Sequence, residues 1–299
     1  MMKNIKYLIL PLVTGAVLSS CGGDNKNEEM DHAMDSTKTE AVKPVNPVSE
    51  TFFQVPSPGE MLTFIKMVGG KNNKNTSFLS SPDNAKNYSD AKLKALNFGI
   101  YSCDLSYCSI FDIGTDALKY FKTVKQMGDQ IGVSSAIKPE IMKRLESNVG
   151  NSDSLAVITD DVYFSSFETL DNSGQGTTLA MVVAGGWIES LFIATNLAKY
   201  EANSPVVERL ADQKYTLENL VEFLKKHEAD ADVASVKADF EGLLAEFAKI
   251  EQKDVSAAGK EEKGKKIMGG GTQLVMTEAI YKSIVEKIKT IRNSYTLTK

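Results

Sequence analysis

Histidine is scarce in this chain of 299 residues, which contains only His32 and His227. A di-iron helical bundle needs two Glu-x-x-His elements, a zincin needs His-Glu-x-x-His, and a serine triad needs a histidine base. The chain also lacks a Gly-x-Ser-x-Gly motif and a Walker loop. Met30, Asp31, His32 and Met34 offer a single imidazole, which is a weak ligand set. The sequence therefore predicts no catalytic residue, no metal site and no cofactor.

Two weaker signals are interpreted as surface features. His227 is flanked by Lys226 and Glu228, so we expect its imidazole to face solvent. Gly269–Gly271 precede Thr272 and could present backbone amides to an anion at a helix start. No strand is expected before them and no Gly-Lys-Ser/Thr follows, which favours a surface loop.

Positive charge is in deficit, with 34 Lys and Arg against 39 Asp and Glu and a formal net charge of −5. An acidic surface argues against nucleic acid as a partner. It also argues against adhesion to anionic lipids through charge alone. If a lipid surface is a partner, another feature of the chain must provide the attachment.

Strand signals are missing: we find no sustained period-two alternation, no Asn-Gly or Asp-Gly turn and no fixed-period repeat. Apolar residues recur instead at helical spacing. The expected fold is all-α, a multi-helix bundle of about nine or ten helices. The expected helices span 57–70, 89–111, 115–131, 139–149, 153–170, 177–200, 205–214, 217–229, 232–252 and 273–295. Their expected caps include Ser57, Thr115, Ser152, Ser204, Thr216, Asp232 and Thr272.

Cysteine is also sparse, with three residues in the chain. Cys103 and Cys108 lie on one predicted helix, about 140° apart around its axis and about 8 Å apart between Cα atoms. A disulfide needs a Cα separation below about 7 Å. We therefore expect two separate buried thiols.

The N-terminus has the three parts of an export signal. Lys3 and Lys6 precede an apolar run, interrupted by Pro11, that is too short for a comfortable membrane span. Leu18-Ser19-Ser20-Cys21 resembles the lipobox of bacterial lipoproteins. That resemblance implies a signal peptide over residues 1–20, and lipidation of Cys21 with a palmitate-type acyl chain that holds the protein to a membrane. Removal of residues 1–20 takes away two lysines and no acids, which changes the net charge from −5 to −7.

Residues 21–55 are rich in Asp, Glu, Asn, Lys, Ser, Thr and Pro, a composition typical of a disordered tether. The helical domain is expected over residues 56–299. Four acids near the start of the tether loosely resemble the surface-export signals of some Bacteroidetes lipoproteins: Asp24, Glu28, Glu29 and Asp31.

The segment from Leu179 to Ala198 is apolar nearly all round. A membrane span is one interpretation, but Glu189 lies at its centre, where a charge costs about 2.5–3.5 kcal/mol. A helix surrounded by other helices of the bundle explains the pattern better.

Two acids fall within apolar helix faces. Asp104 shares its face with Ile100 and Phe111, and Glu189 shares its face with Val182 and Phe192. Buried carboxylates must be paired, hydrogen-bonded or neutral, and such groups gather at functional sites.

Two interpretations of these acids stay open. In the first, Asp104, Glu189, Tyr101 and Trp187 line a pocket for a cationic or polyhydroxylated ligand. In the second, the acids are structural and are satisfied by a lysine, a tyrosine hydroxyl or a helix N-terminus. Asp160 and Asp161 could join them, although at least one of the two is expected to face water.

Three segments together resemble a family of uncharacterised Bacteroidetes outer-membrane lipoproteins: Val55–Pro58 (VPSP) leading into a helix, Leu96–Leu105 (LNFGIYSCDL) and Ala184–Ser190 (AGGWIES). The resemblance covers most of the chain after Cys21. It implies an outer-membrane lipid anchor, on the periplasmic side or at the cell surface, and carries no activity or substrate with it. Cys103 stands where the resemblance implies a small residue such as alanine, which favours a packing role for the thiol.

Three functions follow as hypotheses. The first is a lipid-anchored lipoprotein of the cell envelope whose helical domain binds a partner protein or a small ligand. The second is a hydrolase or lyase using Asp104 with Glu189 or Asp160, which requires both acids in one solvent-reachable cleft, about 5–9 Å apart if glycosidase-like. The third is a purely structural component of an envelope complex, which a large exposed apolar patch would favour.

Overall fold

The structure is a computed structural model that describes residues 57–70, 73–255, 261–262, 265–266 and 271–296. These residues belong to one compact unit, residues 45–299. The predicted signal peptide, the lipobox with Cys21, the predicted tether and the first two residues of the Gly269–Gly271 run lie outside the described residues.

Helices dominate the described part of the chain, which confirms the all-α prediction. The α-helices are α2 (Pro58–Ile65), α3 (Ala91–Ile110), α4 (Gly114–Ile131), α5 (Pro139–Ser147), α6 (Ser152–Asn172), α7 (Gly176–Leu197), α8 (Pro205–Lys225), α9 (Ala231–Phe247) and α10 (Glu278–Thr296). A π-helix, η1 (Lys66–Gly70), continues α2, and a 3₁₀-helix, η2 (Pro82–Asn87), precedes α3.

The first helix begins where its capping signal predicts. The Ser57 hydroxyl accepts a hydrogen bond from the Glu60 amide at 3.3 Å, and Pro58 occupies the first helical position, where its missing N–H costs nothing. The helical path ends at Gly70, as expected, but its last five residues are wound as the π-helix η1.

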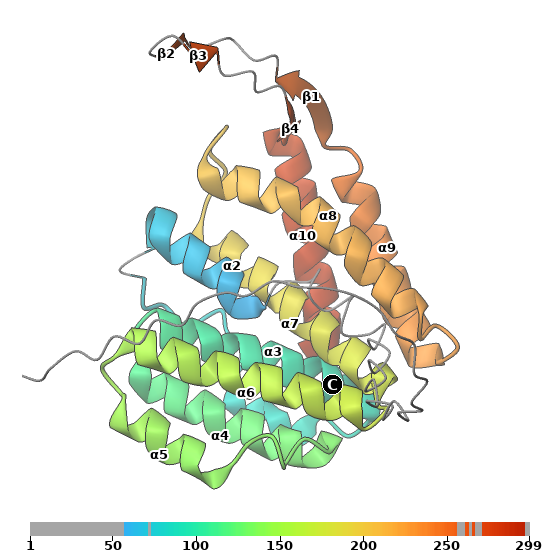
Figure 1. Ribbon diagram of the computed structural model, residues 1–299. Coiled ribbons are helices and arrows are strands. Elements are labelled where there is room, and N and C mark those ends of the chain that lie inside the picture. The colour runs from blue at the N-terminus through green and yellow to red at the C-terminus, as the bar shows by residue number, and fades with distance from the viewer. Residues whose placement is uncertain (1–56, 71–72, 256–260, 263–264, 267–270, 297–299) are drawn as a thin grey trace, which may run out of the picture. The chain divides into compact units, whose positions relative to one another are not determined.

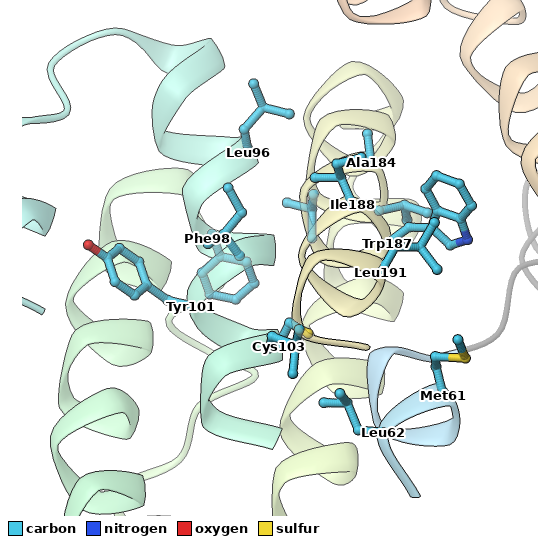
Figure 2. Close-up of a cluster of buried hydrophobic side chains, with 14 of the residues drawn as sticks. Met61, Leu62, Leu96, Phe98, Tyr101, Cys103, Ala184, Trp187, Ile188 and Leu191 are labelled. Atoms are coloured by element: carbon cyan, nitrogen blue, oxygen red, sulfur yellow. The ribbon is translucent and has the colours of Figure 1, made fainter. Parts of the chain in front are cut away.

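Helices α3 and α7 cross at very short range because glycines line their contact. A Cβ atom added at Gly99 would collide with the carbonyl oxygen of Val182, and one added at Gly185 would collide with that of Leu96. Side chains of α2, α3 and α7 fill the space around this crossing (Figure 2). The two helices are therefore the centre of the core.

The remaining helices pack on the two sides of this pair (Figure 1). Helices α4 and α6 lie beside α3, α5 packs on α4 and α6, and α8, α9 and α10 pack around α7. Gly132 ends α4 with a φ of +87°, a left-handed conformation that suits glycine. The arrangement leaves α3 and α7 enclosed by other helices.

Three predicted caps are displaced. The side chains of Asn151 and Asp230 cap α6 and α9, each before the residue we expected, Ser152 and Asp232. Asparagine and aspartate accept amide hydrogen bonds as well as serine does, so composition alone does not choose between adjacent candidates. Thr115 lies inside α4, which begins after Ile113 without a side-chain cap bond.

The two helices expected over 205–214 and 217–229 are one continuous helix, α8, so the prediction of a break at Thr216 is wrong. Thr216 is 8% exposed and faces the interior. No glycine or proline interrupts this stretch, so nothing opposes continuation of the helix.

The chain between α9 and α10 contains strands, which corrects the expectation of none. Strand β1 (Glu251–Val255) pairs antiparallel with β4 (Gly271–Val275), and β2 (Glu261–Glu262) pairs with β3 (Lys265–Lys266). Thr272 lies in β4 opposite Asp254 and does not cap a helix. Strand β1 is mostly polar, and four of its described residues are exposed. Because it is held by backbone pairing rather than by a buried apolar face, its sequence shows no alternation of apolar and polar residues.

Helix α7 is the one described helix long and apolar enough to cross a membrane, by length and composition alone. Of its most apolar 18-residue window, 89% is buried against other parts of the protein. This burial agrees with the interpretation of the segment as a core helix of the bundle.

Candidate functional site

Asp104 and Glu189 lie in the most deeply buried stretches of the fold. Every residue of α3 from 95 to 110 is buried, as is every residue of α7 from 179 to 191. A helix enclosed on all sides has no solvent-facing stripe on which to place an acid. Both residues are 0% exposed, so both carboxyl groups belong to the core.

Arg292 of α10 pairs with Glu189 through two hydrogen bonds. Its Nε donates to Oε2 at 2.8 Å and its Nη2 donates to Oε1 at 3.0 Å. The Phe192 ring covers the guanidinium, with 4.5 Å between Cζ and the ring centroid. Burial by itself lowers the pKa of Arg292, but the carboxylates of Glu189 and Asp104 raise it above its ordinary value. Arg292 therefore supplies a permanent positive charge inside the core.

Asp104 is the second acid of this cluster. Its Oδ2 accepts the Ser80 amide hydrogen bond at 3.2 Å, whereas Oδ1 has no donor among the described residues. Burial raises the pKa of Asp104 well above its ordinary value, and the charge of Glu189 and a hydrogen bond between the two carboxyl groups add to the rise. These causes favour the neutral form of Asp104 beside the Glu189–Arg292 pair.

The loop before η2 closes over the charge cluster. Arg292 donates from Nη2 to the Ser80 hydroxyl at 2.8 Å, and Tyr120 donates to the Ser80 carbonyl at 3.0 Å. Tyr101 donates to the Ser81 carbonyl at 2.8 Å. Burial raises the pKa of Tyr101, with further contributions from Tyr88 and Asp104. The Tyr101 hydroxyl is thus already bound to the backbone of this loop.

Trp187 does not share this environment. Figure 2 shows it projecting from α7 away from α3, on the opposite side from Tyr101. Its indole Nε1 donates to Oε1 of Gln213 at 3.3 Å, and its ring packs on Phe240 with 5.7 Å between centroids. Trp187 and Glu189 are two positions apart, about 200° around a helix, so the two side chains face different neighbours.

The structure brings together three of the four residues proposed for a ligand pocket: Asp104, Glu189 and Tyr101. Each is 0% exposed and forms hydrogen bonds with other residues of the protein. The geometry therefore favours the structural interpretation of the two acids. Glu189 pairs with an arginine and Asp104 accepts from the Ser80 amide, rather than the lysine, tyrosine hydroxyl or helix N-terminus that we expected.

Arg292 was not among the residues proposed from the sequence, although a signal for it exists. The buried face of α10 includes Ile284, Ile288, Ile291 and Tyr295, and Arg292 falls on that same face. A charged residue within an apolar helical stripe is expected to meet an opposite charge. The sequence spacing could have pointed to Arg292, but not to its partner 103 positions away.

Asp160 and Asp161 lie elsewhere. Asp161 is exposed and lies 3.6 Å from Arg144. Asp160 is partly buried against Gly59 at the start of α2, and burial, with the charges of Asp161 and Glu60, raises its pKa to about 6. One of the two acids faces water, as expected.

The expectation that His227 faces solvent is wrong. The ring is partly buried, touches Gly176 at the start of α7 and meets Phe223 edge-on with 5.6 Å between centroids. Burial, together with the charge of Lys226, lowers its pKa. Charged neighbours in the sequence did not predict the exposure of His227, which follows the last turn of α8. Its ring packs against the start of α7.

Cys103 and Cys108 are free and buried, which confirms the prediction of two separate thiols. Burial raises the pKa of both, and the carboxyl groups nearby add to the shift. Since the thiolate is the reactive form, neither cysteine is suited to nucleophilic chemistry.

Within the described residues, no group of three or more His, Cys, Asp or Glu side chains is placed to hold a metal ion. Comparison of the sequence with protein-family models, curated proteins and solved structures gave no match. The family resemblance noted above stays a prediction, and the function rests on the residues of this chain.

Proposed function

We propose that this chain is a lipoprotein, held to the outer membrane by a lipid on Cys21, whose helical domain binds a small ligand without transforming it. The anchor is supported by Leu18-Ser19-Ser20-Cys21 after an apolar run. The polar segment 21–55 then provides a tether between the lipid and the domain.

One observation favours binding over catalysis: Asp104 and Glu189 are both buried in the core. A carboxylate-dependent hydrolase or lyase needs both acids in contact with its substrate. Asp104 and Glu189 are 0% exposed, and Arg292 occupies both oxygens of Glu189. No substrate can reach them without opening the α3–α7 core, so the enzyme alternative gains no support.

Solvent reaches cavities elsewhere on the domain. Two of them flank η1, with volumes of about 580 Å³ and 490 Å³, and both are in the range of small-molecule sites. Met67 and Val68 of η1 line one cavity each and are 67% and 39% exposed. Apolar side chains left uncovered beside cavities favour ligand binding in this region.

The anchor is tested by growing cells that produce the chain with an alkyne-bearing palmitate. We expect label on the wild-type protein and its recovery in outer-membrane fractions, and neither for Cys21→Ala. A wild-type chain that takes up no label would remove the lipid anchor from the proposal.

The binding part is tested by a thermal-shift screen of the mature chain against metals, sugars, polyamines, fatty acids and peptidoglycan fragments. A ligand at 100 times its Kd stabilises the fold by about 2.7 kcal/mol. We expect at least one compound to raise the Tm of the wild type and of Asp104→Asn alike. A shift lost only in Asp104→Asn would move the site into the core, and a screen without any shift would contradict ligand binding.

A second candidate function, docking of a partner protein within an envelope complex, is favoured by exposed apolar residues on and before α6. Val149, Val157 and Phe164 are 36%, 59% and 39% exposed. Substitution of Val157 by aspartate is expected to abolish chemical cross-linking to such a partner in intact cells. Unchanged cross-links in that variant would remove this face from consideration.

A further inference from the structure

Lys66, the first residue of η1, carries a charge that no described residue neutralises in an ion pair. Its ammonium donates to the Ile110 carbonyl at the end of α3 and to the Ser152 hydroxyl at 3.4 Å. Both acceptors are neutral. Among the described residues, no carboxylate forms an ion pair with Lys66. An ammonium has three N–H donors, so these two contacts leave one donor and the full charge available.

This ammonium lies at the wall of the larger cavity beside η1, whose volume is about 580 Å³. The lining also includes Met67, Ile110 and Ala156, three apolar side chains from η1, α3 and α6. Lys66 is partly buried there. A charge next to apolar walls is less well solvated than one on an open surface, which strengthens its attraction for an anion.

The start of α6 adds partial positive charge at the same wall. Ser152 is the first residue of α6, and the Asn151 side chain caps the Ser154 amide. Backbone amides in the first turn of a helix favour negative charge nearby. Asp153 also lines the cavity, but its side chain is exposed. Lys66 and the first turn of α6 therefore contribute positive charge at the wall of the cavity, near the exposed carboxylate of Asp153.

The π-helical turn η1 continues α2 at its C-terminal end, a position where π-turns occur in proteins. Here η1 places Lys66 toward the cavity while Met67 stays 67% exposed beside it. An apolar chain lying along the cavity would cover Met67, and its charged end would meet Lys66.

We propose that this cavity binds a single-chain amphiphilic carboxylate, with its head group on Lys66 and Ser152 and its aliphatic chain against Met67, Ile110 and Ala156. The inference rests on the proposed function and names the ligand class of that function. A lysine that only capped α3 through the Ile110 carbonyl would require neither the cavity nor the uncovered methionine.

Photolabelling of the full-length lipoprotein in isolated envelopes tests the inference. The probe is decanoate with a diazirine in its chain and a terminal alkyne, and the labelled peptides are mapped by mass spectrometry. We expect label on peptides containing Met67 or Ala156. Decanoate should displace the probe at about tenfold lower concentration than decanol or decylammonium, a difference of about 1.4 kcal/mol.

Matched variants distinguish the effects of the Lys66 charge, the volume of the cavity and nonspecific labelling. Lys66→Gln should lower labelling about tenfold, and Lys66→Arg, which keeps the charge, should restore most of it. Ala156→Trp should remove labelling by filling the cavity while Lys66 stays in place. Lys125→Gln, at a lysine of α4 whose side chain is 41% exposed and pairs with Asp129, should label as the wild type does. Circular dichroism checks that each variant is folded.

Equal displacement by decanol and decanoate would overturn the head-group assignment, and wild-type labelling of Lys66→Gln or Ala156→Trp would overturn the site. If the thermal-shift screen finds a ligand but the probe does not label these peptides, the ligand class fails and the proposed function stands. If the screen finds no ligand and no peptide is labelled, both fail. Absence of lipid on Cys21 affects only the anchor.

Discussion

The charge cluster in the core and the cavity beside η1 both place a cation among apolar side chains, but they satisfy it differently. Arg292 is 8% exposed, pairs with Glu189 through two hydrogen bonds and lies against Phe192. Lys66 is partly buried beside a cavity, and within the described part of the chain its acceptors are a carbonyl and a hydroxyl.

The difference follows from access to solvent. A charge that is fully enclosed must be neutralised by the fold itself, because no ion from solution can reach it. A charge at the wall of an open cavity can take its counter-ion from solution, so the fold need not supply one. The core cluster is therefore satisfied within the fold, and the incompletely paired Lys66 is the better candidate for ligand binding.

The largest effect is expected from Arg292→Met, which leaves Glu189 without its counter-charge. Breaking a buried ion pair on one side costs about 3–5 kcal/mol. Urea denaturation at pH 7 measures the loss. Arg209→Met is the matched control, since Arg209 pairs with Glu60 at 3.1 Å near the surface, where such a pair contributes about 0–1 kcal/mol. Equal losses for both arginines would show that the cluster is no tighter than a surface pair.

Gly185→Ala is expected to be next in size, because the new methyl group would meet the Leu96 carbonyl at the α3–α7 crossing. Overpacking of a core costs about 1–3 kcal/mol. Gly150→Ala serves as the control: no atom lies within 4 Å of the added Cβ, so its stability should change by less than about 0.5 kcal/mol. The comparison fails if Gly185→Ala unfolds at the same urea concentration as Gly150→Ala.

Asp104→Asn should change how stability depends on pH. Burial and Glu189 raise the pKa of Asp104 in the folded state, so the folded protein holds a proton that the unfolded chain releases at lower pH. This proton makes its full contribution to the free energy of unfolding below the ordinary aspartate pKa. The contribution is lost as pH rises through the raised pKa of the folded state. The variant, which cannot lose this proton, should gain stability over the wild type between pH 5 and pH 9.

Urea denaturation at both pH values measures this effect. Tyr88, Tyr101 and Tyr120 face the same cluster, and burial raises the pKa of each above its ordinary value, so they stay neutral in this range. An identical pH dependence in the wild type and in Asp104→Asn would show that Asp104 is ionised in the fold.

The smallest effect is expected from Lys66→Met. The variant loses hydrogen bonds to the Ile110 carbonyl and the Ser152 hydroxyl, and a hydrogen bond of this kind contributes about 0.5–1.5 kcal/mol. Since Lys66 forms no ion pair with any carboxylate that the structure describes, its removal leaves no such charge unpaired, and the loss should stay well below that of Arg292→Met in the same assay. A loss of equal size would assign Lys66 to the core structure rather than to a ligand.

Much of the helical framework could be predicted from the sequence because its signals are local. Ser57 with Pro58 marks the start of α2, and Gly132 marks the end of α4. The break expected at Thr216 and the missed strands β1 and β4 show the limit. A polar strand held only by backbone pairing has no periodicity, and a threonine that could cap a helix can equally lie inside one.

The candidate site shows the same division. Apolar neighbours at helical spacing were enough to predict that Asp104 and Glu189 are buried. The five-residue spacing on one helix was enough to predict that Cys103 and Cys108 do not form a disulfide. The predicted pocket also includes Trp187. Its side chain nevertheless lies on another face of α7, toward Gln213.

The sequence by itself determined the helices, the burial of the two acids and the two free thiols, because each depends on residues within a few turns of one another. Only the tertiary structure decided that Arg292 neutralises Glu189 and that Lys66, at the wall of a cavity, forms no ion pair with a described carboxylate. These outcomes depend on how helices far apart in the chain pack together, and helical periodicity within one segment does not determine its neighbours.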